Sequence, residues 1–160
     1  MSELTKLTLI EALEGLKNKK FSSLELTEAF IKNIEKNKNL NAYITETFDI
    51  ARENAKKSDE KIKNGKAGKL EGIPMGIKDI FCTKGVKTTA ASKMLENFVP
   101  PYESTVTQKL SDEGYVLLGK TNTDEFACGS TTTTSYFGPS INPYRNKNDD
   151  RDLVPGGSSG

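Results

Sequence analysis

The sequence predicts an α/β fold, and three observations support it. Amphipathic helical patterns with capping residues fill residues 1–65, which we call the helical lead. From residue 70, short apolar runs alternate with a helical segment, as in layered α/β proteins. From Thr121 onward the chain is rich in Thr, Ser, Asn, Gly and Pro, a composition typical of the loops on which sites are often built.

Three helices are predicted in the helical lead. The first two each begin with a capping box, in which an N-cap hydroxyl and a glutamate three residues later satisfy free backbone N–H groups. The residues that fit these boxes are Thr8 with Glu11, and Ser22 with Glu25. A third helix begins near Thr47. None of the three carries an obvious reactive group, so all are interpreted as scaffold.

Strands are predicted where short apolar or β-branched runs occur. Residues 42–44 form a short strand between the second and third helices, and residues 115–118 form a buried strand. Residues 73–77 make a short apolar run that ends at Lys78. Between these runs, residues 104–113 are predicted as a helix.

Composition excludes several kinds of chemistry. The chain has 23 basic and 22 acidic residues, a net charge of +1, and no histidine. The missing histidine excludes Ser-His-Asp and Cys-His nucleophile systems and zinc sites built on histidine, and two cysteines cannot make a four-cysteine site. We therefore expect no metal site. The near-zero net charge argues against bulk electrostatic binding of nucleic acid.

The sequence also carries an expectation about the compartment. Cys82 and Cys128 have no paired spacing and are predicted to be free thiols in a reducing compartment. No apolar run approaches the length of a membrane span, so no membrane association is expected. The predicted location is the cytoplasm, with an organelle matrix left open.

Lys78 is the best candidate base in a chain without histidine. It ends an apolar run and lies beside Asp79. The ordinary interpretation is a surface lysine paired with its acidic neighbour. The functional interpretation is a lysine in a poorly solvated pocket, where desolvation disfavours the ammonium and leaves a neutral amine that can accept a proton.

Three other patterns allow more than one interpretation. Residues 114–121 match the phosphate-binding pattern G-x-x-x-x-G-K-[ST], but the four middle residues are strand formers, so we reject it. The glycine- and serine-rich residues 154–160 are either a flexible tail or a loop that presents a serine. Asp124 and Glu125 are predicted in the first turn of a short helix, and Cys128 is predicted to be a small buried thiol.

Three ordered segments together resemble the amidase signature family. They are LEGIPMGIKDIF at 70–81, GKTNTDEFACGSTTTTSYFGPSINP at 119–143, and VPGGSSG at 154–160. The resemblance runs over nearly the whole chain. It implies an α/β/α layered fold with a mixed central sheet, of which residues 1–160 are the N-terminal segment. Residues 66–160, after the helical lead, then form the first part of the catalytic core.

The resemblance implies a Ser–cis-Ser–Lys mechanism. By motif, Lys78 corresponds to the catalytic lysine and Ser158 to the bridging serine, while the peptide between Gly157 and Ser158 is expected to be cis and Ser159 belongs to the same loop. The acyl-forming serine is expected downstream of Gly160, so these residues are expected to stop before the nucleophile. The residues expected to line the substrate pocket are Gly129 and Ser130.

Within the family, the segments are most like the glutaminase of tRNA-dependent amidotransferases. This implies glutamine as substrate, subunits B and C of the amidotransferase as partners, and Glu-tRNA(Gln) reached through the complex and converted to Gln-tRNA(Gln) for translation. ATP and magnesium are implied for the partner subunit, with no cofactor bound by this chain. A stand-alone amidase acting on another amide, or a non-catalytic fragment, are the alternatives.

Overall fold

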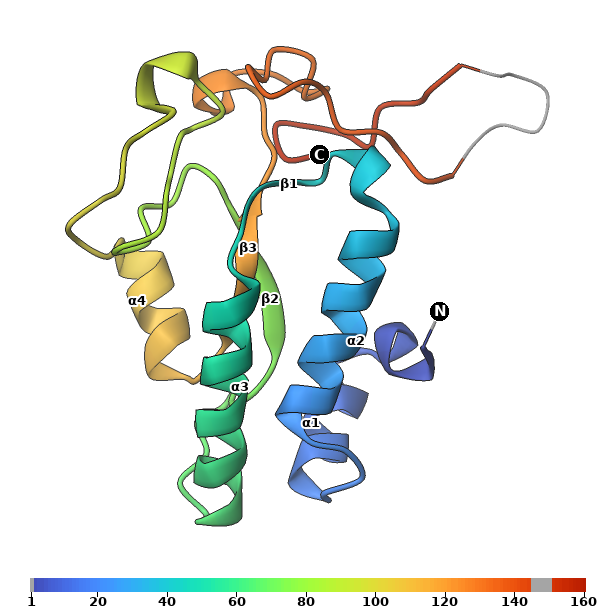
Figure 1. Ribbon diagram of the computed structural model, residues 1–160, viewed down its shortest axis with the longest axis vertical. Helices are drawn as coiled ribbons and strands as arrows, with labels where there is room; N and C mark the ends of the chain where they lie inside the picture. Colours follow the sequence, from blue (N-terminus) through green and yellow to red (C-terminus); the bar gives the residue numbers. More distant parts are fainter. Residues whose placement is uncertain (1, 145–150) are drawn as a thin grey trace. The chain divides into compact units, whose positions relative to one another are not determined.

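The computed structural model describes residues 2–144 and 151–160 (Figure 1). These residues form α-helices and a small sheet, joined by long loops and short 3-10 turns. The helices are α1 (Leu9–Lys17), α2 (Ser23–Lys36), α3 (Phe48–Lys63) and α4 (Thr105–Asp112), and the strands are β1 (Tyr43–Glu46), β2 (Pro74–Lys78) and β3 (Val116–Thr121).

Both predicted capping boxes are present. The Thr8 N–H donates to Glu11 Oε2 at 2.8 Å, and the Glu11 N–H donates to Thr8 Oγ1 at 3.3 Å. The equivalent bonds join Ser22 and Glu25 at 2.8 and 3.0 Å. The starts of α1 and α2 are therefore fixed by local sequence, which is why they could be predicted.

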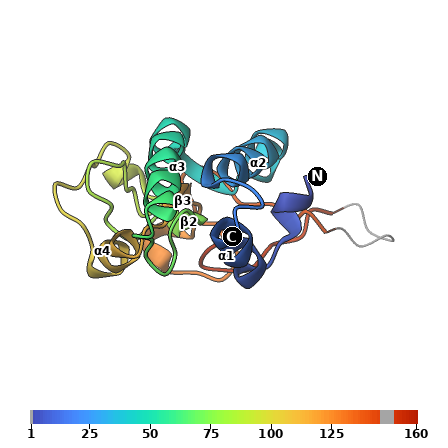
Figure 2. The same ribbon diagram turned by 90° about the horizontal axis from the view of Figure 1, so that it is seen from below.

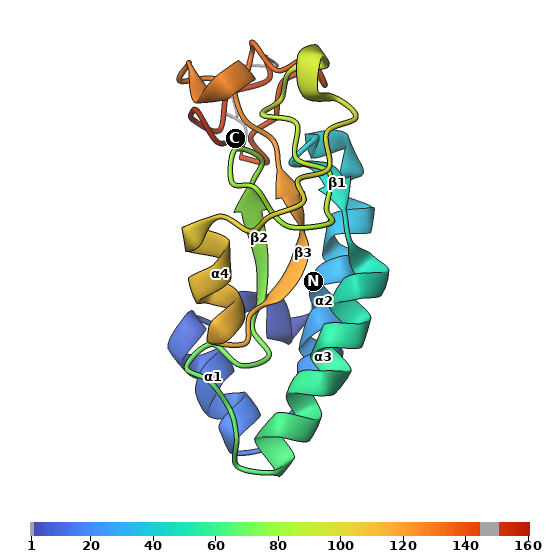
Figure 3. The same ribbon diagram turned by 90° about the vertical axis from the view of Figure 1, so that its left-hand side faces the viewer.

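The chain divides into two compact units. The first unit consists of Met1–Lys36, Thr47–Gly76 and Thr105–Leu118. The second unit consists of Asn37–Glu46, Ile77–Ser104 and Gly119–Gly160. In the first unit, α2 packs on α3, and α1 buries Ala12 and Leu16 against Leu26 and Ile73. Figures 2 and 3 show the strands β2 and β3 with α3 on one side and α4 on the other. This arrangement agrees with the predicted α/β/α layering.

The sheet is mixed, as predicted, with strand order β1-β3-β2. β1 runs antiparallel to β3. β2 runs in the same direction as β3, because the Val116 N–H donates to Ile73 O near one end and the Asp79 N–H donates to Thr121 O at the other. The parallel pair brings the C-terminal ends of β2 and β3 to the same edge.

β3 is longer than its apolar run predicted. It continues past residue 118 through Gly119 and Lys120 to Thr121. A Cβ at Gly119 would lie 2.3 Å from Thr45 O, so the glycine permits close pairing with β1. Lys120 consequently lies within a buried strand and not in a phosphate-binding loop.

The second unit is built mainly of loops held by hydrogen bonds. Much of its interior is polar. Its buried polar residues are Asp79, Thr83, Thr88, Thr89, Ser92, Lys120, Asn122, Thr123, Asp124, Thr132, Ser135 and Ser140. A buried polar group is costly unless it is hydrogen-bonded, so this concentration marks the unit as the place to look for a site. Across residues 2–144 and 151–160, no helix is long and apolar enough to cross a membrane.

Candidate catalytic site

Lys78 and Ser158, distant in sequence, lie in direct contact. Lys78 is the last residue of β2, and both side chains are half-buried. Lys78 Nζ lies 2.5 Å from Ser158 Oγ. An amine this close to a hydroxyl can exchange a proton with it without any rearrangement of the backbone.

The loop that carries Ser158 is anchored by its own backbone. The Asp124 N–H donates to Ser158 O at 2.8 Å, and the Gly160 N–H donates to Asn122 O at 3.3 Å. Thr123 and Ser159 form an isolated antiparallel bridge between these two bonds. The peptide bond between Gly157 and Ser158 is cis. Residues 156–160 are thus an ordered loop and not a flexible tail.

Gly129 and Ser130 lie against this loop. A Cβ at Gly157 would lie 2.0 Å from the carbonyl carbon of Ser130, so the two backbones touch directly. Gly129 in turn packs on Asp124, because a Cβ there would lie 2.3 Å from Asp124 Cγ. The structure therefore brings the two residues expected at the substrate pocket beside the loop that carries Ser158.

Asp124 organises the loop that follows it. The residue precedes a 3-10 turn at Glu125–Ala127, but its side chain makes no helix cap. Its carboxylate instead accepts hydrogen bonds from the backbone of Thr131, Thr132 and Thr134 and from the Thr134 hydroxyl, at 2.9 to 3.4 Å. The predicted place at the start of a short helix is confirmed, since Asp124 is the N-cap residue and Glu125 lies in the first turn. The Asp124 carboxylate does not cap that turn, because loop N–H groups that lack a secondary-structure partner recruit it.

These hydrogen bonds keep Asp124 ionised. Burial alone would raise the pKa of the Asp124 carboxyl, but the bonds from Thr132, Thr134 and Thr131 outweigh it and hold the pKa below its usual value. A carboxylate that accepts several N–H bonds is a fixed negative group. Asp124 therefore serves as an anchor of loop structure.

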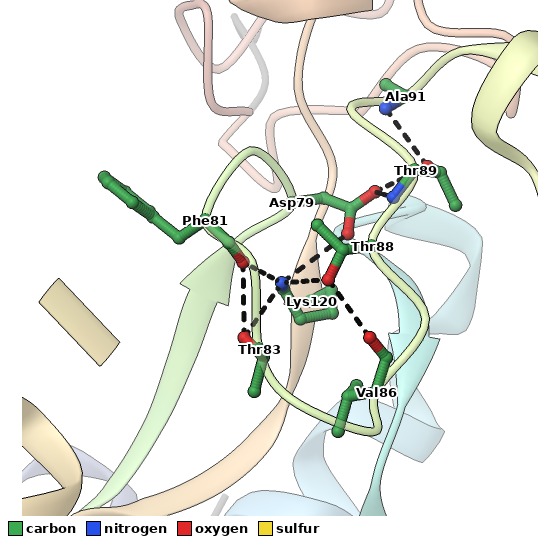
Figure 4. Close-up of polar contacts among 8 residues, drawn as sticks. All are labelled: Asp79, Phe81, Thr83, Val86, Thr88, Thr89, Ala91 and Lys120. Atoms are coloured by element: carbon green, nitrogen blue, oxygen red, sulfur yellow. Dashed lines mark hydrogen bonds and ion pairs between the residues drawn. The ribbon is translucent and has the colours of Figure 1, made fainter. Parts of the chain in front are cut away.

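A buried ion pair between Asp79 and Lys120 was not predicted from the sequence. Lys120 and Asp79 are both fully buried, with Nζ 3.9 Å from Oδ1 (Figure 4). Burial raises the pKa of Asp79, opposed by hydrogen bonds from Thr89 and by the charge of Lys120. Burial lowers the pKa of Lys120 to about 8, opposed by the charge of Asp79. The sequence carries one indication of this pair, because Asp79 and Lys120, with opposite charges, each follow an apolar run and the two runs form neighbouring strands.

Left-handed backbone conformations gather around these groups. Among the described residues of the second unit, the non-glycine residues with positive φ are Asn41, Ala90, Ala91, Phe126, Ala127 and Thr132. Two of them are tied together, since the Phe126 N–H donates to Ala90 O at 2.9 Å. Alanine and phenylalanine seldom adopt such conformations, and when they do the surrounding structure enforces them.

The cysteines differ partly from expectation. Neither forms a disulfide, as predicted, but Cys128 is exposed where a buried thiol was expected. Cys128 directly follows the 3-10 turn, in a surface loop. The expectation of burial relied only on the apolar character of a thiol, which does not reveal the course of the loop. Among the described residues, no group of three or more Cys, Asp or Glu side chains is placed to hold a metal ion.

Comparison with known proteins identifies the family. The family model described as Amidase matches residues 25–160, most of the chain. The chain belongs to the amidase family. The chain is 59% identical, over all 160 residues, to a protein of Hyphomonas neptunium that is named as the A subunit of glutamyl-tRNA(Gln) amidotransferase. The match covers 100% of the chain but 33% of that relative, so the chain spans about a third of its length.

Solved structures show that the chain has the amidase signature fold. The protein of the same name from Thermotoga maritima is 34% identical, with a TM-score of 0.71 over 99% of this chain and 31% of that one. A bacterial aryl acylamidase, described as a member of the amidase signature enzymes, is 31% identical, with a TM-score of 0.81 over 96% of this chain and 31% of that one. The fold is therefore shared by relatives whose names describe different enzymes, an amidotransferase subunit and an aryl acylamidase.

Proposed function

We propose that this chain is the N-terminal part of the glutaminase subunit of a Glu-tRNA(Gln) amidotransferase. One observation carries the catalytic part of the proposal: the 2.5 Å contact between Lys78 Nζ and Ser158 Oγ. The choice of glutamine and of a tRNA-linked pathway is supported by the 59% identity to a relative of that name. The identity to the aryl acylamidase is lower, at 31%.

In the proposed mechanism Lys78 acts as the base and Ser158 relays the proton. A neutral Lys78 amine accepts the Ser158 proton while Ser158 takes one from a serine nucleophile outside residues 1–160. The activated oxygen attacks the side-chain carbonyl of glutamine, and collapse of the tetrahedral intermediate leaves a glutamyl ester. The proton returns through Ser158 to the departing nitrogen, which leaves as ammonia. Water then hydrolyses the ester and releases glutamate.

The remaining roles follow the same proposal. Gly129 and Ser130 line the glutamine pocket, and Gly157 and Ser159 maintain the loop that presents Ser158. Ammonia passes to the amidotransferase assembly, where subunits B and C complete the reaction and the partner uses ATP and magnesium to activate Glu-tRNA(Gln). The protein works in the cytoplasm, or in an organelle matrix if its source is eukaryotic, without a membrane partner.

The test uses the full-length protein assembled with its partner subunits. Lys78→Ala and Ser158→Ala should each lower glutamine-dependent formation of Gln-tRNA(Gln) by roughly 10²–10⁴-fold, the usual contribution of a catalytic base. Lys87→Ala is the matched control, because Lys87 is an exposed lysine of a neighbouring loop. With ammonium chloride in place of glutamine, every variant should still form product, because only the ammonia source has been lost. Near wild-type glutamine-dependent turnover in Lys78→Ala would refute the proposal.

A stand-alone amidase is the second candidate, and the TM-score of 0.81 to an aryl acylamidase favours it. The full-length protein without partners would be assayed on glutamine and on an acylated aniline. The amidotransferase proposal expects partner-dependent ammonia release from glutamine and no cleavage of the anilide. Efficient anilide cleavage by the protein alone, with no binding of subunits B and C, would favour the stand-alone amidase.

A further inference from the structure

The buried ammonium of Lys120 is fully occupied by fixed acceptors. Nζ donates to the main-chain oxygen of Phe81 at 2.5 Å, to Thr88 Oγ1 at 2.9 Å and to Thr83 Oγ1 at 3.1 Å. An ammonium has three hydrogens, so these acceptors use all of them. Figure 4 shows Nζ surrounded by these groups and by the Asp79 carboxylate. Lys120 therefore holds three points of the 81–88 loop from within β3.

Asp79 holds the continuation of the same loop. Its Oδ2 accepts from the Thr89 N–H at 2.9 Å and from the Thr89 hydroxyl at 2.5 Å. Oδ1 has no hydrogen-bond donor within the described part of the chain and faces Lys120 at 3.9 Å. The Asp79 backbone is held on both sides, since its N–H donates to Thr121 O and its carbonyl accepts from the Ala90 N–H.

The stability of the fold does not explain such a pair. A buried ion pair usually loses about as much in desolvation as it gains in attraction, and apolar replacements of similar volume are often neutral or stabilising. The opposed pKa shifts of Asp79 and Lys120 show the same desolvation. What the pair does provide is geometry, because each charge fixes several main-chain or hydroxyl groups at once.

The ion pair of Asp79 and Lys120 fixes the backbone next to Lys78. Lys78 immediately precedes Asp79, and in the described part of the chain its Nζ has one hydrogen-bond partner, Ser158 Oγ. One bond does not hold a long, flexible amine in place. The backbone that carries Lys78 is instead held from the next residue, whose main chain bonds to Thr121 and Ala90. The Asp79 side chain adds a second attachment, because it accepts from Thr89 and pairs with Lys120 of β3.

We infer that Asp79 and Lys120 are positioning residues, which set the place of the Lys78 amine by locking the backbone just after it onto β3. This inference rests on the proposed function, in which Lys78 is the base. Neither residue touches the substrate in this scheme. Their loss displaces the amine relative to Ser158 and slows the chemical step.

The test compares four variants of the full-length protein assembled with its partner subunits. Asp79→Asn and Lys120→Met remove one charge each, the double variant removes both, and Lys87→Met is an exposed control. Each single variant is expected to lower kcat for glutamine about a hundredfold with KM changed less than about threefold, because misplacing a reacting group by about 1 Å has that effect. Lys87→Met should keep wild-type kcat.

The double variant separates positioning from simple stability. Each single variant leaves one buried charge unpaired, whereas the double variant leaves none, so its Tm should recover toward wild type. The kcat of the double variant should nevertheless stay about a hundredfold low. Recovery of kcat together with Tm would mean that the pair only supports the fold, and it would overturn the inference. Single variants with kcat within about threefold of wild type would do the same.

Two further results keep the test decisive. If the variants that lose a charge do not fold, Thr89→Val provides a milder test, because it removes one hydroxyl donor to Asp79 without changing any charge. Thr89→Val is expected to lower kcat about tenfold. Unchanged kcat in Thr89→Val then overturns the inference. Failure of the proposed function looks different: Lys78→Ala and Ser158→Ala would keep their activity, whereas failure of positioning alone leaves those two inactive and the Asp79 and Lys120 variants active.

Discussion

Lys120 makes stability depend on pH. Its pKa is lowered to about 8 in the folded protein because burial disfavours the ammonium, against an ordinary value of 10.5. Between these values the unfolded chain binds more protons than the folded one, so the contribution of Lys120 to stability rises with pH across that window. Below pH 8 the residue is protonated in both states and its contribution is constant.

The measurement compares the full-length protein with its Lys120→Met variant. Their difference in unfolding free energy should change in favour of the wild type as pH rises from about 8 to about 10, by up to about 1.4 kcal/mol per pH unit. Thermal unfolding at several pH values in that range reads this out. A difference that stays constant across the range would show that the Lys120 pKa is not lowered.

Asp124 is expected to matter through its charge as well as its shape. Asp124→Asn keeps the size of the side chain but weakens the bonds from the backbone of residues 131–134, because bonds to a charged acceptor contribute about 1.5–3 kcal/mol against about 1 for neutral ones. We expect a loss of roughly 1–3 kcal/mol in stability and faster protease cleavage within 126–136. Asp112→Asn is a suitable control, since Asp112 is exposed at the end of α4. Equal cleavage rates in the two variants would contradict the anchoring role.

At the scale of elements, loop 156–160 depends on the absence of side chains at its contacts. Gly157→Ala would place a Cβ 2.0 Å from the main-chain carbonyl carbon of Ser130, and neither backbone can move aside cheaply. We expect this variant to displace Ser158 and to lose glutamine-dependent activity by about 10²-fold or more. Kinetic assay of the assembled full-length protein measures it.

Gly85→Ala is the matched comparison. Gly85 has a positive φ, at +75°, which Gly157 does not have, and nothing lies within 4 Å of its would-be Cβ. The expected result is a loss of about 1 kcal/mol in stability from the backbone conformation alone, with kcat retained. If both glycine variants lose activity equally, close packing at Gly157 is not the reason.

How far the sequence predicted each element depends on how local its determinants are. The capping boxes at Thr8 and Ser22 depend on residues three positions apart, so they could be predicted from the sequence alone. The extension of β3 through Lys120 could not, because it requires β1 and β2 as neighbours. The Asp124 contacts with residues 131–134 were missed for the same reason. Whether the carboxylate caps its own turn or binds the N–H groups of the following loop depends on how that loop folds back, which the local sequence does not determine.

The candidate site shows the same division. Lys78 and Ser158 were named from motifs, and the structure places them in contact. The charges that follow the two apolar runs are visible in the sequence, but no motif indicated that the Asp79 carboxylate would face Lys120. Their pairing requires both apolar runs to become adjacent parallel strands, which periodicity alone does not determine.

At the scale of the whole molecule, the 160 residues alone are expected to release no ammonia from glutamine. The proposed nucleophile lies outside them, and the chain spans about a third of its 59%-identical relative. Ammonia release would be measured for the 160-residue chain and for the full-length protein at equal concentration, with circular dichroism reporting whether the shorter chain folds. Glutaminase activity of the shorter chain would contradict the proposed place of the nucleophile.

The contact between Gly157 and Ser130 restricts which residues position 157 can accept. Two backbones that meet without room for a methyl group leave almost no substitutions available to natural selection. Any side chain at position 157 therefore requires one of the two backbones to move, and Ser158 would move with it.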